Sequence, residues 1–334
     1  MNYIKKHKKM VYIIFVPIFI ILVLAVLSIR KIPEDIEYGV SFSKYHSDEL
    51  GLSWLEAYNA ILGDLGVRHL RLSAHWPMIE PSEGEYNWEE LDVQMDLASD
   101  YDAEVILGVG KRLPGWPECH IPDWARGLSE SDLENRITKY INEVVYRYKD
   151  HPSLVAWQVE NEPFLLGFAK EHCGKLNKDF FDKEISLVKT IDGSHPILLT
   201  DAGETGTWFS SYKRGAWFGT TMYLYIWSNK LGPLRYPMTP HFFRIKQNIM
   251  ELFYGKKPSF LIELGLEPWL LQPIVDTPIE VQYSRMSIDK FENIISFAEK
   301  SGYDKQYLWG AEWWYWMIKR GNSRYWDRAR ELFY

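Results

Sequence analysis

Short apolar runs alternate with longer segments of helical periodicity along most of the chain. Residues 104–109 (EVILGV) and 154–159 (LVAWQV) are the clearest of these runs. Runs of this length, rich in β-branched side chains, predict buried strands, and their alternation with helices predicts βαβ units around a parallel sheet. The predicted strands are residues 38–42, 67–73, 104–109, 154–159, 197–200, 220–224, 259–263 and 306–311. Predicted helices include residues 53–65, 88–98, 131–148 and 325–332.

Eight strands with intervening helices favour a closed (β/α)8 barrel, the TIM-barrel form of the α/β class, over an open doubly wound sheet. An open nucleotide-binding sheet usually carries a glycine-rich phosphate loop after its first strand, and residues 43–52 hold no such motif. The barrel domain is predicted to span residues 38–334, after a polar linker at residues 30–37. In a barrel, active residues lie at the carboxyl ends of the strands, so those positions are the first candidates.

The segment before the linker has a different character. Residues 10–29 carry no charge. A helix of this length is long enough to cross a bilayer core of roughly 30 Å. Four lysines lie within residues 1–9, so the positive-inside rule predicts a cytoplasmic tail there and a barrel outside the cytoplasm. The alternative is a signal peptide cleaved near Val26 and Ser28; the long apolar run favours a retained transmembrane anchor. Both alternatives place the barrel outside the cytoplasm.

Composition narrows the class of protein. Hydrophobic residues at 46% and charged residues at 25% are ordinary globular values, and the net charge of −7 argues against a nucleic-acid partner. The 15 Trp and 21 Tyr are more than a plain core needs, and such aromatic richness is typical of sugar-binding clefts. Cys119 and Cys173 lack the spacing of a zinc site, and a disulfide or two free thiols are both compatible with the sequence.

Carboxylates stand at the ends of two predicted strands. The fourth strand runs into Glu160-Asn161-Glu162-Pro163, and the seventh ends at Glu263. A carboxylate at the end of an apolar strand is poorly solvated, so its presence there favours a functional role. Taken alone, however, the Asn-Glu-Pro motif is explained equally by a turn, and the lone Glu263 by a helix cap. Two carboxylates facing each other across a barrel mouth shift each other's pKa, so that one stays ionised while the other holds a proton. Cleaving a glycosidic bond with retention requires that pairing.

The segment 157–163 (WQVENEP), together with Glu263, resembles the signature of the retaining barrel glycosidases grouped as clan A. That clan contains cellulases, mannanases, xylanases and β-galactosidases, and the resemblance covers residues 38–334. It implies that Glu162 is the acid/base, that Asn161 bonds the sugar 2-hydroxyl and that Glu263 is the nucleophile. Arg71 resembles the arginine that holds the nucleophile ionised, a role that a guanidinium beside a carboxylate also favours on physical grounds. A structural ion pair within the barrel is the alternative for Arg71.

Further positions follow from the same resemblance. Tyr223 resembles the tyrosine that contacts the nucleophile, with Tyr225 as its rival. The clan commonly places a tryptophan after the eighth strand as a floor for the sugar, because sugar rings stack on aromatic faces. Trp313 is the first candidate and Trp309 the second, since period-two alternation would put both on one side of an extended strand.

Other acidic residues on the same face are weaker candidates. Glu267 lies four residues beyond the seventh strand and is a less suitable nucleophile than Glu263; Glu204 is a further acidic residue on the correct face. His75 and His120 have no ligand set of suitable spacing, which argues against a metal-dependent sugar isomerase.

The sequence therefore predicts a membrane-anchored, extracytoplasmic, retaining β-glycosidase. It would act on an oligo- or polysaccharide without cofactor or metal. The competing hypothesis is a non-catalytic carbohydrate-binding protein on the same fold.

Overall fold

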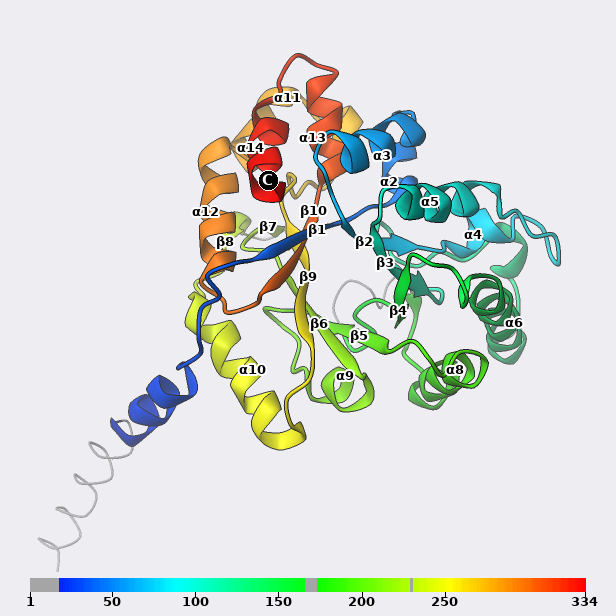
Figure 1. The fold of residues 1–334 in the computed structure, drawn as a ribbon, viewed down its shortest axis with the longest axis horizontal. Coiled ribbons are helices and arrows are strands. Elements are labelled where there is room, and N and C mark those ends of the chain that lie inside the picture. The colour runs from blue at the N-terminus through cyan, green and yellow to red at the C-terminus, as the bar shows by residue number, and fades with distance from the viewer. Residues whose placement is uncertain (1–17, 166–172, 229–230) are drawn as a thin grey trace, which may run out of the picture.

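The fold is that of a computed structural model, which describes residues 18–165, 173–228 and 231–334 (Figure 1). The predicted (β/α)8 barrel is confirmed. In the described part of the chain, parallel strands close in the order β1-β10-β9-β6-β5-β4-β3-β2. These strands are β1 (Glu37–Ser41), β2 (His69–Ser73), β3 (Glu104–Val109), β4 (Leu154–Val159), β5 (Ile197–Asp201), β6 (Trp217–Met222), β9 (Ser259–Gly265) and β10 (Lys305–Trp309).

Helices cover the outside of the barrel (Figure 1). They are α2 (Lys44–Glu49), α3 (Trp54–Gly63), α4 (Trp76–Ile79), α5 (Glu89–Asp100), α6 (Glu130–Tyr148), α8 (Lys178–Ile191), α9 (Phe209–Arg214), α10 (Pro240–Tyr254), α11 (Ile279–Arg285), α12 (Ile288–Glu299), α13 (Ala311–Ile318) and α14 (Arg324–Phe333). Serine caps two of the longer helices, because its side-chain oxygen can accept a free N–H of the first turn: Ser129 does so for α6 and Ser287 for α12.

Most predicted elements have the observed bounds to within two residues, and β3 and β4 agree at both ends. The sixth strand was predicted at residues 220–224, whereas β6 begins at Trp217 and ends at Met222. Gly219 lies inside β6, at a point where an added Cβ would approach Ile262 of β9 to 2.8 Å. Glycine weakens a strand pattern in the sequence, but here it permits close packing of two neighbouring strands.

A two-stranded hairpin follows β6 and was not predicted. It pairs β7 (Tyr225–Ser228) with β8 (Gly232–Arg235) in antiparallel register outside the barrel sheet. Each strand has four residues, and the side chains of β8 alternate between half-buried and exposed. So short and exposed a pair leaves little hydrophobic pattern in the sequence.

Alternation along the strands separates the inside of the barrel from its outer core. The inward group is Ile106, Ala156, Leu198, Phe260, Ile262 and Tyr307. The positions between them pack against the helices, as Trp157 and Leu107 do. Toward the carboxyl end of β4 the inward position after Ala156 is Gln158, which accepts a hydrogen bond from Arg71 of β2 at 2.8 Å. The interior therefore becomes polar at the end where the strands lead into the candidate site.

The segment predicted to cross a membrane lies partly outside the described residues, as does the predicted cytoplasmic tail at residues 1–9. Residues 18–27 form a helix whose apolar side chains are mostly exposed. Within the described residues, no helix combines the length and apolar character needed for a membrane crossing. The predicted linker at 30–37 is attached to the barrel, since the Arg30 guanidinium donates to Asn248 and Glu251 of α10.

Candidate active site

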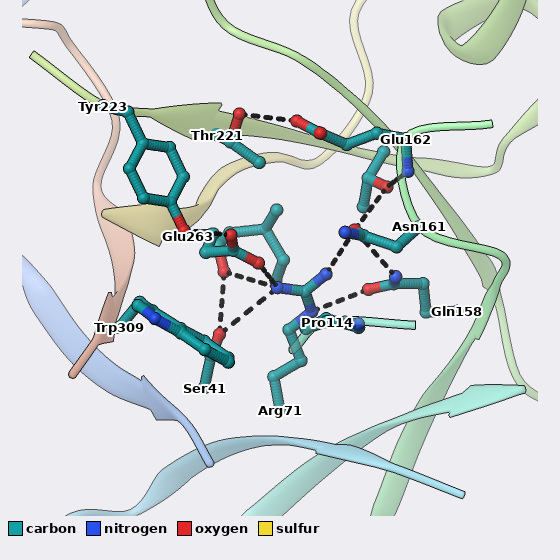
Figure 2. Close-up of polar contacts among 12 residues, drawn as sticks. Ser41, Arg71, Pro114, Gln158, Asn161, Glu162, Thr221, Tyr223, Glu263 and Trp309 are labelled. Atoms are coloured by element: carbon teal, nitrogen blue, oxygen red, sulfur yellow. Dashed lines mark hydrogen bonds and ion pairs between the residues drawn. The ribbon is translucent and has the colours of Figure 1, made fainter. Parts of the chain in front are cut away.

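Glu162 and Glu263 both stand at the carboxyl end of the barrel, on elements that face each other (Figure 2). Glu162 follows β4 in a left-handed conformation with φ of 44°, and Glu160 has φ of 56°. Such conformations are costly for residues other than glycine and are concentrated at functional sites. Glu263 lies within β9, which continues two residues beyond the predicted end of the seventh strand. Each glutamate is 6% exposed, so both are buried.

Glu263 is surrounded by donors. Arg71 donates to Oε2 and the Tyr223 hydroxyl donates to Oε1, each at 2.5 Å (Figure 2). Hydrogen bonds to an anion from a cation and from a hydroxyl stabilise the ionised carboxylate and fix its orientation. Tyr225, the rival of Tyr223, starts the hairpin and donates to Asn293 instead. The structure therefore brings Arg71 and Tyr223 together on Glu263, as the sequence predicted.

Arg71 connects several polar side chains of the site through hydrogen bonds. Its side chain is 1% exposed and reaches β4 and the loop after it: Nε donates to Gln158, and one terminal nitrogen donates to Asn161 Oδ1 at 2.7 Å. The other terminal nitrogen holds Glu263. A guanidinium has five donors in a rigid fork. Arg71 therefore fixes β4 relative to β9 and holds the side chains of Asn161 and Glu263 in place.

Asn161 is oriented by its oxygen. The Oδ1 atom accepts from Arg71, from the Thr200 hydroxyl at 3.2 Å and from Gln158 at 3.4 Å. Because three donors converge on this oxygen, the NH2 group of the amide points away from them. An amide held in this way presents donors to whatever enters the site.

Glu162 has the opposite environment from Glu263. The Thr221 hydroxyl donates to its Oε1 at 2.7 Å. Burial, followed by the negative charges of Glu118 and Glu263, raises the pKa of Glu162 to about 8. At neutral pH Glu162 therefore holds a proton, whereas Glu263 is paired with a cation. One carboxylic acid and one carboxylate face the same space.

A third carboxylate, Glu118, belongs to the site and was not predicted. It lies in the loop after β3, where Arg112 donates to its carboxylate from Nε at 3.2 Å and from a terminal nitrogen at 3.0 Å. Burial, opposed by Arg112 and reinforced by the charge of Glu263, raises the pKa of Glu118. Its position in a Trp- and Pro-rich loop on the correct face of the barrel was the available signal, but no periodicity marks it.

This loop is bonded to the end of β4. The Glu160 carboxylate accepts from the backbone N–H groups of Lys111 and Arg112, at 3.1 and 2.6 Å, and the Asn161 N–H donates to the Arg112 carbonyl at 2.6 Å. Cys119, directly after Glu118, forms a disulfide with Cys173. The disulfide is thus the alternative that the structure adopts for the two cysteines.

Trp313 was the first candidate for the sugar floor, and the structure contradicts it. β10 ends at Trp309 and α13 begins at Ala311, so the two residues are not on one extended strand. Trp313 is 0% exposed; its indole N–H donates to Gln282 and its ring packs on Tyr325. Trp309 instead lies beside Ser41 and on the same side of the site as Glu263 (Figure 2). Of the two tryptophans, Trp309 is the one that lies at the candidate site.

The remaining acidic candidates have other partners. Glu204 accepts the backbone N–H of Tyr223, and Glu267 accepts the indole N–H of Trp309. Among the described residues, Arg71 donates to Glu263 and to neither of these two carboxylates. His75 and His120 lie ring to ring at 4.3 Å, and burial lowers their pKa values to about 4 and about 2. Among the described residues, no cluster of three His, Cys, Asp or Glu side chains is arranged to hold a metal ion.

Comparison with known proteins finds similarity to barrel glycoside hydrolases. Residues 53–193 match the family model Glyco_hydro_42, described as "Beta-galactosidase". The chain is 27% identical over 104 residues to beta-galactosidase LacZ of Lactobacillus acidophilus, a match that covers 26% of this chain and 16% of that protein. It is 31% identical over 75 residues to a probable mannan endo-1,4-beta-mannosidase of Aspergillus terreus, covering 22% and 18% of the two chains.

Among solved structures, a GH5_18 protein from Bifidobacterium longum has the same fold, with a TM-score of 0.58 and 14% identity over 83% of this chain and 69% of that one. These matches confirm the resemblance to the clan A barrel glycoside hydrolases. The chain spans less than a fifth of the length of the two curated relatives, so their substrates are properties of those proteins.

Proposed function

Starting from this likeness to the clan A barrel glycoside hydrolases, we propose that the chain hydrolyses β-linked glycosides with retention of configuration. Glu263 is the nucleophile and Glu162 the acid/base. The observation that carries the proposal is the contrast between two buried carboxyl groups, one held by Arg71 and Tyr223 and the other protonated, with a pKa raised to about 8. A retaining glycosidase needs this division between an anion and an acid.

In the first step, Glu263 attacks the anomeric carbon and the bond from that carbon to the leaving oxygen breaks. Glu162 transfers its proton to that oxygen as it departs. The products of this step are the released alcohol and a glycosyl ester of Glu263. Tyr223, bonded to Oε1 of the nucleophile, and Arg71, bonded to Oε2, keep the carboxylate aimed at the carbon until it reacts.

In the second step, a water molecule replaces the ester. Once Glu263 is an ester its negative charge is gone, and with it one of the causes that raise the pKa of Glu162. Glu162, now ionised, takes a proton from water as the oxygen of that water attacks the anomeric carbon. The ester bond breaks, Glu263 returns as a carboxylate and Glu162 is protonated again. One water molecule is consumed for each bond cleaved, and two inversions give retention.

Asn161 and Trp309 are proposed to hold the sugar. The NH2 group of Asn161, oriented by three donors to its oxygen, is suited to bond the 2-hydroxyl. The Trp309 ring offers an apolar face on which a pyranose can stack. Since the two curated relatives are named for β-galactosidase and β-mannosidase activities, β-galactosides and β-mannosides are the first substrates to test.

The competing hypothesis, a non-catalytic carbohydrate-binding protein, has less support in the structure. Burying a carboxylate and a guanidinium together costs several kcal/mol of desolvation, which a binding cleft has no need to incur. The side chain of Arg71 is 1% exposed and that of Glu263 is 8% exposed, and Arg71 also donates a hydrogen bond to Asn161. Such a network is expected where one carboxylate must react and is not required for stacking a sugar.

We also propose that the domain works outside the cytoplasm, next to a membrane. Residues 10–29 carry no charge, and the described part of that segment exposes apolar side chains such as Phe19 and Leu22. The Cys119–Cys173 disulfide supports an oxidising compartment. Arg30 bonds the carbonyl of Gly302 just before β10, so the segment joins the barrel at the end opposite the candidate site. Protease added to intact cells would digest the barrel; a barrel protected until the cells are lysed would contradict this location.

The reaction is tested with two variants and a panel of nitrophenyl β-glycosides. Glu263→Gln is expected to abolish turnover of every substrate that the wild type cleaves, because Glu263 is the carboxylate that Arg71 and Tyr223 orient for attack. Glu162→Ala should retain the first step for substrates with a good leaving group, which need no proton, and should accumulate the glycosyl ester.

Azide separates the two roles. It needs no general base, so it should restore turnover of Glu162→Ala and yield a glycosyl azide of retained configuration, with no effect on Glu263→Gln. Glu251→Gln, which removes a carboxylate paired with Arg30 at the opposite end of the barrel, is the control for loss of a buried charge. Substantial activity in Glu263→Gln, or azide rescue of neither variant, would overturn the assignment.

A further inference from the structure

Glu267 and His46 meet Trp309 at the edge of the site, and neither takes part in the proposed reaction. We propose that Glu267 and His46 form a clamp that fixes the orientation of the Trp309 ring, so that its face is presented to the sugar bound at the point of cleavage. Glu267 and His46 are then positioning residues, which act through Trp309. The inference rests on the proposed function in that it takes the ligand at the barrel mouth to be a sugar.

Glu267 uses both carboxylate oxygens within the clamp. The Trp309 indole N–H donates to Oε1 at 2.7 Å, and His46 Nε2 lies 2.8 Å from Oε2. The Glu267 side chain is 14% exposed, and that of His46 is 10% exposed. A short hydrogen bond from an indole to a largely buried carboxylate is charge-assisted and directional, so it restrains rotation of the ring about its side-chain bonds.

His46 restrains the same ring from its face. Its imidazole stacks on Trp309 with the ring centroids 5.6 Å apart and the planes at 24°. The second ring nitrogen, Nδ1, lies 3.3 Å from the Glu49 carboxylate. Both nitrogens thus face carboxylates, which only accept hydrogen bonds when ionised, so both nitrogens donate and the ring is an imidazolium. A cation stacked on indole adds cation–π attraction to the contact.

The charges around His46 agree with this protonation. Glu267 and Glu49 bond it directly, and Glu312 of α13 adds a third negative charge nearby. Burial alone would lower the pKa of His46, but these carboxylates outweigh it and raise the pKa well above 6.5. The clamp is therefore intact at neutral pH. It loosens as pH rises through the pKa of His46, because the neutral ring can no longer donate to both carboxylates.

The position of His46 in the clamp is fixed by hydrogen bonds at the N-terminus of α2. Glu312 accepts the backbone N–H of Ser43 at 2.6 Å, and Ser43 in turn accepts the N–H of His46 with its hydroxyl at 3.2 Å. Ser43 is the N-cap of α2, which carries His46. The orientation of Trp309 thus depends on α2, on the loop after β9 and on α13, three elements that come together only in the closed barrel.

Fixing this ring matters because stacking is directional. An aromatic ring and a sugar face make their fullest contact when they are nearly parallel, and a tryptophan free to rotate would lose part of this contact in each substrate complex. Misplacing a substrate by about 1 Å can cost on the order of 100-fold in rate. Loosening the clamp should therefore lower kcat/KM by between about tenfold and 100-fold.

Two variants test the clamp. Glu267→Gln keeps an oxygen that can accept the indole N–H but removes the charge opposite His46. His46→Phe keeps a stacked ring but removes both ion pairs. The control is His195→Phe. Asp192 Oδ2 accepts the Trp157 indole N–H at 2.8 Å and lies 2.7 Å from His195 Nδ1, so these three residues also join a tryptophan, a carboxylate and a histidine, away from the site.

Tryptophan fluorescence provides a measurement that needs no turnover. The pH titration of the full chain is compared with that of Trp309→Phe, and the difference isolates Trp309 among the 15 tryptophans. A stacked imidazolium quenches indole emission, so the Trp309 signal should rise as pH increases through the pKa of His46. The transition should move to lower pH in Glu267→Gln and be absent in His46→Phe, while His195→Phe should behave as the wild type.

The outcomes separate the clamp from the reaction. Support requires the shifted or missing transition together with a fall in kcat/KM that His195→Phe does not share. If Glu267→Gln fails to fold, judged by its melting temperature, His46→Phe decides alone. The clamp is overturned if both variants keep the wild-type titration, or if their kcat and KM match the control. A chain without glycosidase activity would refute the proposed function, whereas the fluorescence titration would still decide whether the clamp exists.

Discussion

Removing the charge of Glu118 should shift the pH dependence of the reaction, because that charge acts on the proposed acid. Glu118→Gln deletes a negative charge that raises the pKa of Glu162, and it also frees Arg112, whose positive charge lowers that pKa. The two effects have the same sign. The pKa of Glu162 should therefore fall from about 8, and the protonated form required for the first step should be lost at a lower pH.

The size of the shift follows from the order of the causes. Burial is the largest cause of the raised pKa of Glu162, and the charge of Glu118 comes second, ahead of that of Glu263. Removing the second cause should lower the pKa by about 1, or ~1.4 kcal/mol in the cost of ionising Glu162. Burial remains, so the pKa should stay above the ordinary value of 4.5.

The assay is kcat/KM from pH 4 to 10 on a substrate with a poor leaving group, for which proton donation limits the first step. Since kcat/KM reports the free enzyme, its alkaline limb should lie near pH 8 in the wild type and about one pH unit lower in Glu118→Gln. A nitrophenyl glycoside, which needs no proton in that step, should show a much weaker alkaline limb in both proteins.

Glu251→Gln is the matched control, since Glu251 is paired with Arg30 as Glu118 is with Arg112, but at the opposite end of the barrel. Its alkaline limb should stay at the wild-type pH. An alkaline limb of Glu118→Gln that stays in place, or moves to higher pH, would refute the view that Glu118 raises the pKa of Glu162.

Three further predictions concern stability and binding. Arg71→Met should lower the free energy of unfolding by about 3–5 kcal/mol, because it leaves a buried carboxylate without its cation; a change under about 1 kcal/mol in urea denaturation would contradict this. Trp313→Phe should lower the melting temperature but leave KM unchanged, whereas Trp309→Phe should raise KM; the reverse pattern would restore the original assignment. Reducing the Cys119–Cys173 disulfide, which joins residues separated by 54 positions, should cost up to ~4 kcal/mol, and the melting temperature of a double Ser variant should not respond to reductant.

The fold was largely predictable because its strands are buried on both faces. β3 and β4 agree with the predicted residues 104–109 and 154–159 at both ends, since an apolar run bounded by polar residues marks a strand directly. The hairpin of β7 and β8 escaped prediction because its short, half-exposed strands lack that contrast.

The candidate site was predictable where it follows from the ends of strands. Glu263 ends an apolar run and Glu162 lies three residues beyond one, so barrel topology alone brings them to one mouth. Trp313 was misassigned because the change from strand to helix falls between Trp309 and Ala311, a boundary that a run of aromatic residues hides. A helix or strand is easier to predict than the residue at which it ends. The direction of a side chain near such a boundary depends on whether the residue belongs to the strand or to the helix.

By itself, the sequence determined the barrel and the two facing glutamates, because both depend on local periodicity and on the order of the strands. Arg71 was identified through the resemblance to the clan A glycosidases. Only the tertiary structure decided the chemistry around these residues. Glu118 approaches Glu162 through a loop that folds back on Arg112, and Glu267 meets His46 across 221 residues of sequence. Hydrogen-bond directions and the burial that raises the pKa of Glu162 arise when distant segments pack together, and no pattern along a single segment encodes them.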